Sequence, residues 1–94
     1  MHLQGTVRIP LYAKDGTVRA YALIDAADAD FVNQWRWNLH LCNGKQYAAR
    51  TQWIGIRNAA VRLHRALLGL ERGDRRWGDH INRDTLDDRR ENLR

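Results

Sequence analysis

Residues 35–53 decide the fold of this chain, and they read WRWNLHLCNGKQYAARTQW. Polar and apolar residues alternate in the two runs that flank Asn43-Gly44. This dipeptide between alternating runs is a strong signal for a two-residue β-hairpin turn. The sequence therefore predicts paired antiparallel strands at 35–41 and 46–53.

Another hairpin is predicted upstream, where residues 7–12 and 18–24 alternate around Asp15-Gly16. The glycine supplies the left-handed backbone conformation that a tight turn requires. Pro10 has no backbone N–H to donate, which indicates that the first strand lies at a sheet edge.

The segments on either side of the 35–53 hairpin complete the predicted elements. Apolar residues at helical spacing predict a short amphipathic helix over 26–34. Asp25 is its expected N-cap, and Asp28 stabilises the first turn through the helix dipole. Downstream, residues 59–63 predict a last strand and 64–70 a short helix with buried leucines.

Length and composition limit the class of protein. Ninety-four residues suffice for one domain with one modest core. The single cysteine excludes an internal disulfide, and without a Cys-x-x-Cys pair no structural zinc is expected. No apolar run is long enough to span a membrane, and residues 1–20 lack a secretory signal pattern. We expect a reduced, cytoplasmic setting.

The charge distribution favours a polyanionic partner. Basic residues outnumber acidic ones by 16 to 11, and fourteen of the sixteen are arginine. Guanidinium groups bind phosphate through paired hydrogen bonds, although a GC-rich genome also enriches arginine. The excess lies in residues 1–70, with nine Lys/Arg and four Asp/Glu. This part is expected to contact a phosphate backbone in a salt-dependent, sequence-independent way.

One face of the 35–53 hairpin is a candidate DNA-contact surface. Arg36, Asn38 and His40 alternate along its first strand. Arg50 and Gln52, or their cross-strand neighbours, are expected on the same side. A two-stranded ribbon fits a DNA groove. An ordinary solvated face explains the pattern equally well.

Residues 78–94 read GDHINRDTLDDRRENLR and carry the candidate chemistry. A carboxylate such as Asp79 binds a hard divalent cation, and an imidazole such as His80 takes a proton from water near neutral pH. An isolated Asp-His pair is more often a surface hydrogen bond. Here several arginines follow the pair and Leu63-His64-Arg65 precedes it, which points to a phosphate backbone as substrate.

The C-terminal residues resemble, in order and spacing, the HNH homing endonucleases of phage and intron type. The matching positions are Asp79-His80-Ile81, Leu86, the run 87–90 and Asn92-Leu93-Arg94. Residues 7–53 are more loosely similar to the β-rich, DNA-binding-like modules that precede HNH sites. The resemblance implies an α+β fold in one compact domain, 1–94. Two β-hairpins and a short helix would form a small antiparallel sheet module over 1–63. Residues 64–94 would form a ββα-metal HNH motif with an incomplete final helix.

The resemblance also implies a function, metal-dependent hydrolysis of a phosphodiester in double-stranded DNA. Asp79 would ligate one Mg²⁺ or Mn²⁺ ion, and His80 would be the general base. Asn92 would hold the loop around His80 by side-chain hydrogen bonds, and His64 would support that loop rather than take a direct part. The expected DNA contacts are Arg36, Arg50, Arg65, Arg83, Arg89 and Arg90.

Several positions depart from the family pattern. Asp88 stands where the family prefers Asn, and Arg83 stands where a turn glycine is usual. Consecutive strand residues point to opposite faces, so Asp79 and His80 can meet on one phosphate only if the backbone at 78–80 is irregular. Gly78, where a larger residue is common, would permit such a bulge.

The family's second metal ligand lies on the final helix, past Arg94, so the ion is expected to be weakly held without DNA. Three other interpretations fit the sequence: a non-catalytic DNA-binding module, an inactive or truncated HNH remnant, and a protein-interaction domain. The oligomeric state is open, with a monomer as one option. The expected location is the cytoplasm of a bacterial or phage-infected cell.

Overall fold

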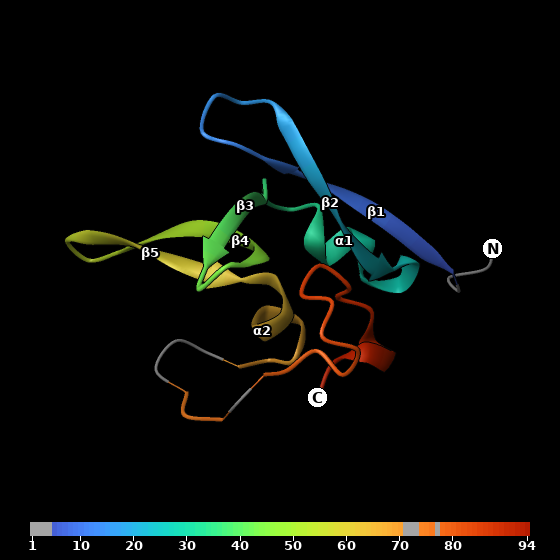
Figure 1. The fold of residues 1–94 in the computed structure, drawn as a ribbon. Coiled ribbons are helices and arrows are strands. Elements are labelled where there is room, and N and C mark those ends of the chain that lie inside the picture. The colour runs from blue at the N-terminus through green and yellow to red at the C-terminus, as the bar shows by residue number, and fades with distance from the viewer. Residues whose placement is uncertain (1–4, 71–73, 77) are drawn as a thin grey trace.

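The computed structural model describes residues 5–70, 74–76 and 78–94, and this part has an α+β fold with a five-stranded mixed sheet (Figure 1). The strands are β1 (Thr6–Tyr12), β2 (Val18–Asp25), β3 (Asn38–Cys42), β4 (Lys45–Ile54) and β5 (Arg57–Arg62), in the order β2-β1-β3-β4-β5. The helices are short: α1 (Ala29–Val32), α2 (Leu63–Leu67) and the 3-10 turns η1 (Ala26–Asp28) and η2 (Arg90–Asn92).

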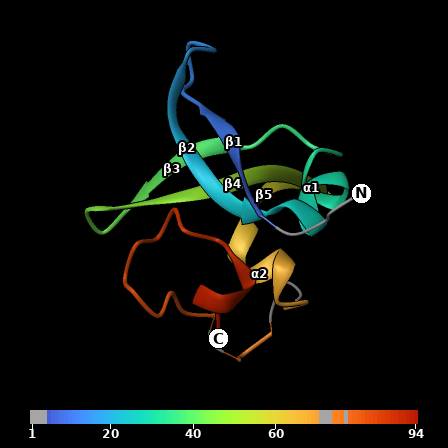
Figure 2. The ribbon, with the colours of Figure 1, turned by 90° about the vertical axis from the view of Figure 1, so that its right-hand side faces the viewer.

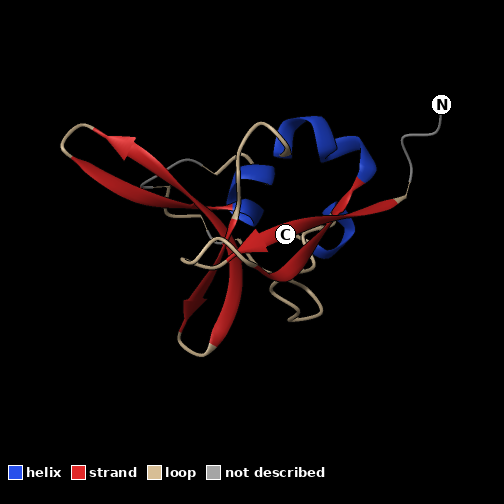
Figure 3. Cartoon of the chain, turned by 90° about the horizontal axis from the view of Figure 1, so that it is seen from above, coloured by secondary structure: helices blue, strands red, loops and turns tan. Residues whose placement is uncertain are grey.

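Both predicted hairpins are present, and β5 adds a third strand pair. β1 pairs with β2, β3 with β4, and β4 with β5, all antiparallel. Asn43 and Gly44 have φ values of 52° and 77°, the left-handed conformation that a type I′ turn needs at both central positions. Seen from above, strands on the left and at the bottom of the view project away from the helices (Figure 3).

The sheet is mixed, whereas the sequence predicted an antiparallel one, because β1 and β3 run parallel. Their contact is short: Tyr12 pairs with Asn38, and the Tyr12 amide donates to the Trp37 carbonyl at 3.2 Å. The chain crosses back after β2, so β3 starts beside the end of β1 and continues in the same direction. β1 lies between β2 and β3, so the prediction that the Pro10 strand is at a sheet edge is wrong. Pro10 is tolerated because β1 contacts β3 only at Tyr12, and no N–H is needed at residue 10.

The predicted helix over 26–34 is split into the 3-10 turn η1 and the single-turn helix α1. Asp25 makes no side-chain cap bond; its carboxylate accepts from the Arg90 amide at 3.0 Å. The Asp28 carboxylate binds the Arg90 guanidinium at 2.9 and 3.0 Å. Both acids therefore anchor the C-terminal segment, and the prediction that the Asp25 side chain caps the helix is wrong.

One hydrophobic core joins the sheet to the C-terminal segment. Alternating residues of β1 and β2 supply one side of it, and α2 contributes Leu63 and Leu67. Trp37 is buried and its indole N–H donates to the Val32 carbonyl at 2.8 Å. The buried members are Ile9, Leu11, Ala22, Ile24, Val32, Trp37, Ala48, Leu63, Leu67 and Leu93. Because Leu93 belongs to this cluster, residues 64–94 share the core of residues 1–63.

The C-terminal segment, residues 78–94, docks against the outer strand β2 and lies next to α2 (Figure 2). The Leu23 amide donates to the Leu86 carbonyl at 2.8 Å, and the Asp88 amide donates to the Leu23 carbonyl at 2.7 Å. Within the segment, His80 pairs with Leu93 in an isolated antiparallel bridge. The described residues thus contain a short antiparallel contact in place of the two strands predicted for the ββα-metal motif.

Candidate active site

His80 and Asp88 form a buried pair at the centre of the C-terminal segment. His80 Nε2 lies 2.6 Å from Asp88 Oδ1, and the side chains are 4% and 1% exposed. The pairing with Leu93 fixes the His80 backbone, while hydrogen bonds to Leu23 hold the backbone beside Asp88. The edge of the sheet therefore positions the carboxylate that binds the imidazole.

His64, at the start of α2, extends this pair to a cluster of three. Its ring centroid lies 4.6 Å from that of His80, and the Tyr47 ring of β4 lies 5.9 Å from His64 and 6.2 Å from His80. Ligand atoms of His64, His80 and Asp88 all lie within 4.8 Å of one another. Two imidazoles and one carboxylate are thereby brought together beside the Tyr47 ring.

Gly78 allows His64 to approach, which differs from its predicted role. A Cβ at this position would lie 3.0 Å from His64 Cδ2 and 3.3 Å from Leu68 Cδ1. Gly78 does not have a positive φ, and Asp79 exchanges both backbone hydrogen bonds with Arg94, at 3.0 and 3.2 Å. The glycine is therefore needed for close packing rather than for a bulge.

Burial and charge determine the protonation of the cluster. The pKa of His64 falls from 6.5 to about 4, chiefly because the ring is buried, and the nearby His80, Arg62 and Arg65 act in the same direction. Burial raises the pKa of Asp88, and its hydrogen bond with His80 opposes this shift. His64 is therefore a neutral imidazole at neutral pH.

Asp79 does not join this cluster. Its carboxylate is 61% exposed and lies 3.3 Å from the Arg94 guanidinium, whose hydrogen bond lowers the Asp79 pKa. The regular backbone pairing sends adjacent side chains to opposite faces, so His80 is buried while Asp79 points to solvent. The carboxylate that contacts His80 is Asp88, which the sequence identified only as a departure from the family pattern.

A pocket of about 270 Å³ opens beside the histidines and has a basic wall. The cationic side chains that line it are Lys45, Arg62, Arg65 and Arg83. The Arg62 guanidinium lies 4.2 Å from the centre of the Tyr47 ring, and Arg83 occupies its turn with a φ of 64°. Lys45 and Arg62 were not predicted, because they belong to β4 and β5 and meet residues 78–85 only at this pocket of the folded chain.

Asn92 bridges the two ends of the loop that follows His80. Its Oδ1 accepts from the Asn82 amide at 2.9 Å, and its Nδ2 donates to the Asp87 carbonyl at 2.8 Å. The side chain is buried. These bonds set the path of residues 82–87 and hence the place of Asp88.

The predicted DNA-contact arginines are mostly engaged within the protein. Arg89 binds Asp87 and Glu91, which raises the Arg89 pKa, and Arg90 also donates to the Leu67 carbonyl at 2.6 Å. The Arg65 side chain donates to the Asp74 and Arg76 carbonyls, both at 3.1 Å.

Arg36 and Arg50 of the 35–53 hairpin lie on aromatic rings. The Arg36 guanidinium is 3.8 Å from the Tyr12 ring centre, and that of Arg50 is 4.2 Å from the Trp35 ring centre. The cross-strand partner of His40 is Tyr47, so Arg50 faces the other side of β4. A single face that carries His40 and Arg50 together is therefore not present.

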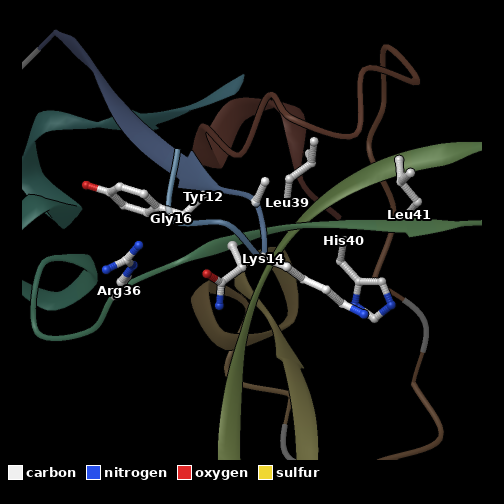
Figure 4. Close-up of a pocket in the computed structure, with 9 residues that line it drawn as sticks. Tyr12, Lys14, Gly16, Arg36, Leu39, His40 and Leu41 are labelled. Atoms are coloured by element: carbon white, nitrogen blue, oxygen red, sulfur yellow. The ribbon is translucent and has the colours of Figure 1, made fainter. Parts of the chain in front are cut away.

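A larger pocket, about 580 Å³, lies between the β1–β2 turn and β3 (Figure 4). Tyr12, Lys14, Arg36 and His40 line it, without a carboxylate among its described lining residues. Figure 4 shows Tyr12 and Arg36 on one side of the view, and Lys14 with His40 on the other. The pocket lacks a base held by an acid, so size alone does not make it the reactive site.

Comparison with protein-family models, curated proteins and solved structures finds no significant match. No helix in the described part of the chain is long and apolar enough to cross a membrane. The resemblance to HNH nucleases therefore stays a prediction, and the function is argued from the site.

Proposed function

We propose that this chain is an HNH-type endonuclease that hydrolyses phosphodiester bonds in double-stranded DNA with the help of an added divalent metal ion. The observation that carries the proposal is the buried His80–Asp88 pair, 2.6 Å apart, beside a pocket with four cationic side chains. A held imidazole and a basic pocket are the two parts that hydrolysis of a phosphate ester requires.

His80 acts as the general base in this proposal. Asp88 accepts a hydrogen bond from His80 Nε2–H, which fixes the tautomer and leaves the lone pair on Nδ1. That nitrogen takes the proton of the attacking water. Asn92 acts indirectly, because its hydrogen bonds hold the loop that leads to Asp88.

The basic wall binds the phosphate. Lys45, Arg62 and Arg83 line the pocket beside His80, so their charges attract the anionic backbone and stabilise the additional negative charge of the transition state. The Arg62 guanidinium lies over the Tyr47 ring, which holds it at the pocket through a cation–π contact. Substrate binding is therefore expected to weaken as salt rises.

The described residues do not form a Mg²⁺ site on their own. Mg²⁺ prefers six oxygen ligands, and Asp79 is the only carboxylate among the described residues that line the pocket. Its ion pair with Arg94 also competes with a metal. We accordingly propose that Mg²⁺ or Mn²⁺ is weakly held without DNA, and the steps assigned to His80 and the basic wall do not depend on its position.

Plasmid nicking tests the proposal. The purified chain is expected to nick supercoiled plasmid in Mg²⁺ or Mn²⁺, and EDTA should abolish the activity. His80→Ala should lower the rate by about 100-fold or more, the usual contribution of a general base. Asp30→Ala, at an exposed acid on α1, is the control. Equal nicking by the wild type and His80→Ala would remove His80 from the mechanism.

A second candidate, a non-catalytic DNA-binding module, is favoured by one further observation. Residues 31–70 contain no Asp or Glu but carry six Lys/Arg, so β3, β4, β5 and α2 form a continuous cationic stretch. Salt-dependent DNA binding without nicking, unchanged in Asp79→Ala, would support this candidate over the nuclease.

A further inference from the structure

Asp88 has an oxygen that the hydrolysis proposal does not use. Oδ1 binds His80, but Oδ2 is buried and has no hydrogen-bond partner among the described residues. The Asp88 side chain is 1% exposed. A buried carboxylate oxygen without a partner is costly and calls for a bound group that would satisfy it.

Two imidazoles lie beside the Asp88 carboxylate. His64, His80 and Asp88 place their ligand atoms within 4.8 Å of one another, and all three residues are buried. A tetrahedral Zn²⁺ with bonds of about 2.0–2.1 Å separates its ligand atoms by roughly 3.3 Å. The ligand atoms of the cluster are separated by distances from 2.6 Å, between His80 Nε2 and Asp88 Oδ1, to at most 4.8 Å. Small side-chain rotations would bring them to the spacing of a tetrahedral site.

The three side chains are supported in the way metal ligands usually are. The His64 ring packs closely against Gly78, where an added Cβ would lie 3.0 Å from His64 Cδ2 and 3.3 Å from its Nε2, so the ring position is restricted. The Asp88 backbone is bound to Leu23 of β2, and Tyr47 packs beside both imidazoles. The donors therefore come from α2, the paired segment at His80 and the sheet edge, so the fold brings them together.

We propose that His64, His80 and Asp88 bind one transition-metal dication of the Zn²⁺ class. Two imidazoles and a carboxylate suit Zn²⁺ or Co²⁺, whereas Mg²⁺ prefers oxygen ligands alone. Sequence patterns predicted no zinc site, because these ligands are not in a Cys-rich motif and lie far apart along the chain. A water molecule or the DNA phosphate would fill the fourth position.

The site has a consequence for activity that rests on the proposed function. A neutral imidazole has one free lone pair, so a metal bound to His80 removes the base that the hydrolysis proposal requires. Zn²⁺ is therefore expected to inhibit nicking that is measured in Mg²⁺. The metal would act as a reversible inhibitor at the same histidine.

Metal titration of the full chain tests the site directly. Co²⁺ is added to the metal-free protein while the visible absorption of tetrahedral Co²⁺ is followed, and Zn²⁺ is then used to displace it. One ion per chain is expected. His64→Gln and Asp88→Asn should each weaken binding by about 10-fold or more. His40→Gln, outside the cluster, is the matched control and should bind as the wild type does.

Circular dichroism of each variant separates lost ligands from lost fold. Folded His64→Gln and Asp88→Asn proteins with wild-type metal affinity would overturn the proposal, as would the absence of a tetrahedral Co²⁺ band in the wild type. If an Asp88→Asn protein did not fold, His64→Gln alone would decide. Metal binding without any nicking would contradict the proposed nuclease but leave the metal site intact.

Discussion

At the residue scale, His80 and Asp88 show why the candidate site was only half predictable. The Asp-His pair is visible in the sequence, but the irregular backbone expected at 78–80, which would let both side chains meet, is absent, and the two side chains diverge. The true partner, Asp88, lies in a loop without periodicity, so no pattern connects it to His80. Only the docking of residues 86–88 on Leu23 brings it there.

His64 gives the stability of the metal-free protein a defined pH dependence. Its pKa falls from 6.5 to about 4 on folding, so the unfolded chain binds more protons between these values. The free energy of unfolding should therefore rise from pH 4 to pH 6.5, by up to about 3 kcal/mol from this residue. Urea unfolding in EDTA across this range measures it.

The matching variant is His64→Gln, which removes the titrating group. Asp88 acts in the opposite direction, since its raised pKa makes the folded state hold its proton longer as pH rises. The difference between wild type and His64→Gln therefore isolates the histidine. Parallel curves for the two proteins would show that His64 is not buried as described.

At the element scale, local signals predicted the hairpins, while contacts between distant segments were missed. Asn43-Gly44 defines its turn within four residues, so sequence alone suffices. The parallel contact joins Tyr12 to Asn38, which is 26 positions away, and the ion pair joins Asp28 to Arg90, which is 62 positions away. The residues next to each partner in the sequence contain no signal for these contacts. Asp28 was therefore interpreted as a helix-stabilising acid.

Arg90 connects the η1 turn, α2 and the C-terminal segment, so its substitution should affect stability. It binds Asp28 and donates to the Leu67 carbonyl. Because the side chain is 53% exposed, solvent reduces the gain, and Arg90→Gln should cost about 1 kcal/mol. Arg19→Gln, at an exposed pair with Asp15, should leave stability unchanged. Denaturant unfolding compares the two.

Arg90→Gln also distinguishes a structural role of Arg90 from the predicted DNA contact. If Arg90 only holds the fold, Arg90→Gln should keep its DNA affinity under conditions where it is fully folded. Lost affinity with unchanged stability would restore the original expectation for this residue.

At the scale of the whole molecule, residues 31–70 carry six positive and no negative side chains, whereas residues 71–94 carry seven of each. The pocket combines both regions, because Lys45 and Arg62 come from the sheet and Asp79 and His80 from the C-terminal segment. Composition predicted this division of charge. The sheet order that brings the two regions together at one pocket could not be read from it.

The salt dependence of DNA affinity should therefore come from cationic side chains of the sheet at this pocket. The logarithm of the binding constant falls against the logarithm of salt concentration with a slope of about −0.9 for each phosphate contact. Lys45→Gln and Arg62→Gln should each make the slope less steep by about 0.9, because each removes one contact at the pocket wall. Arg19→Gln removes the same charge from β2 and should leave the slope unchanged. Fluorescence anisotropy with one duplex at several salt concentrations measures all three. Equal slopes for every variant would mean that net charge, rather than this pocket, attracts the DNA.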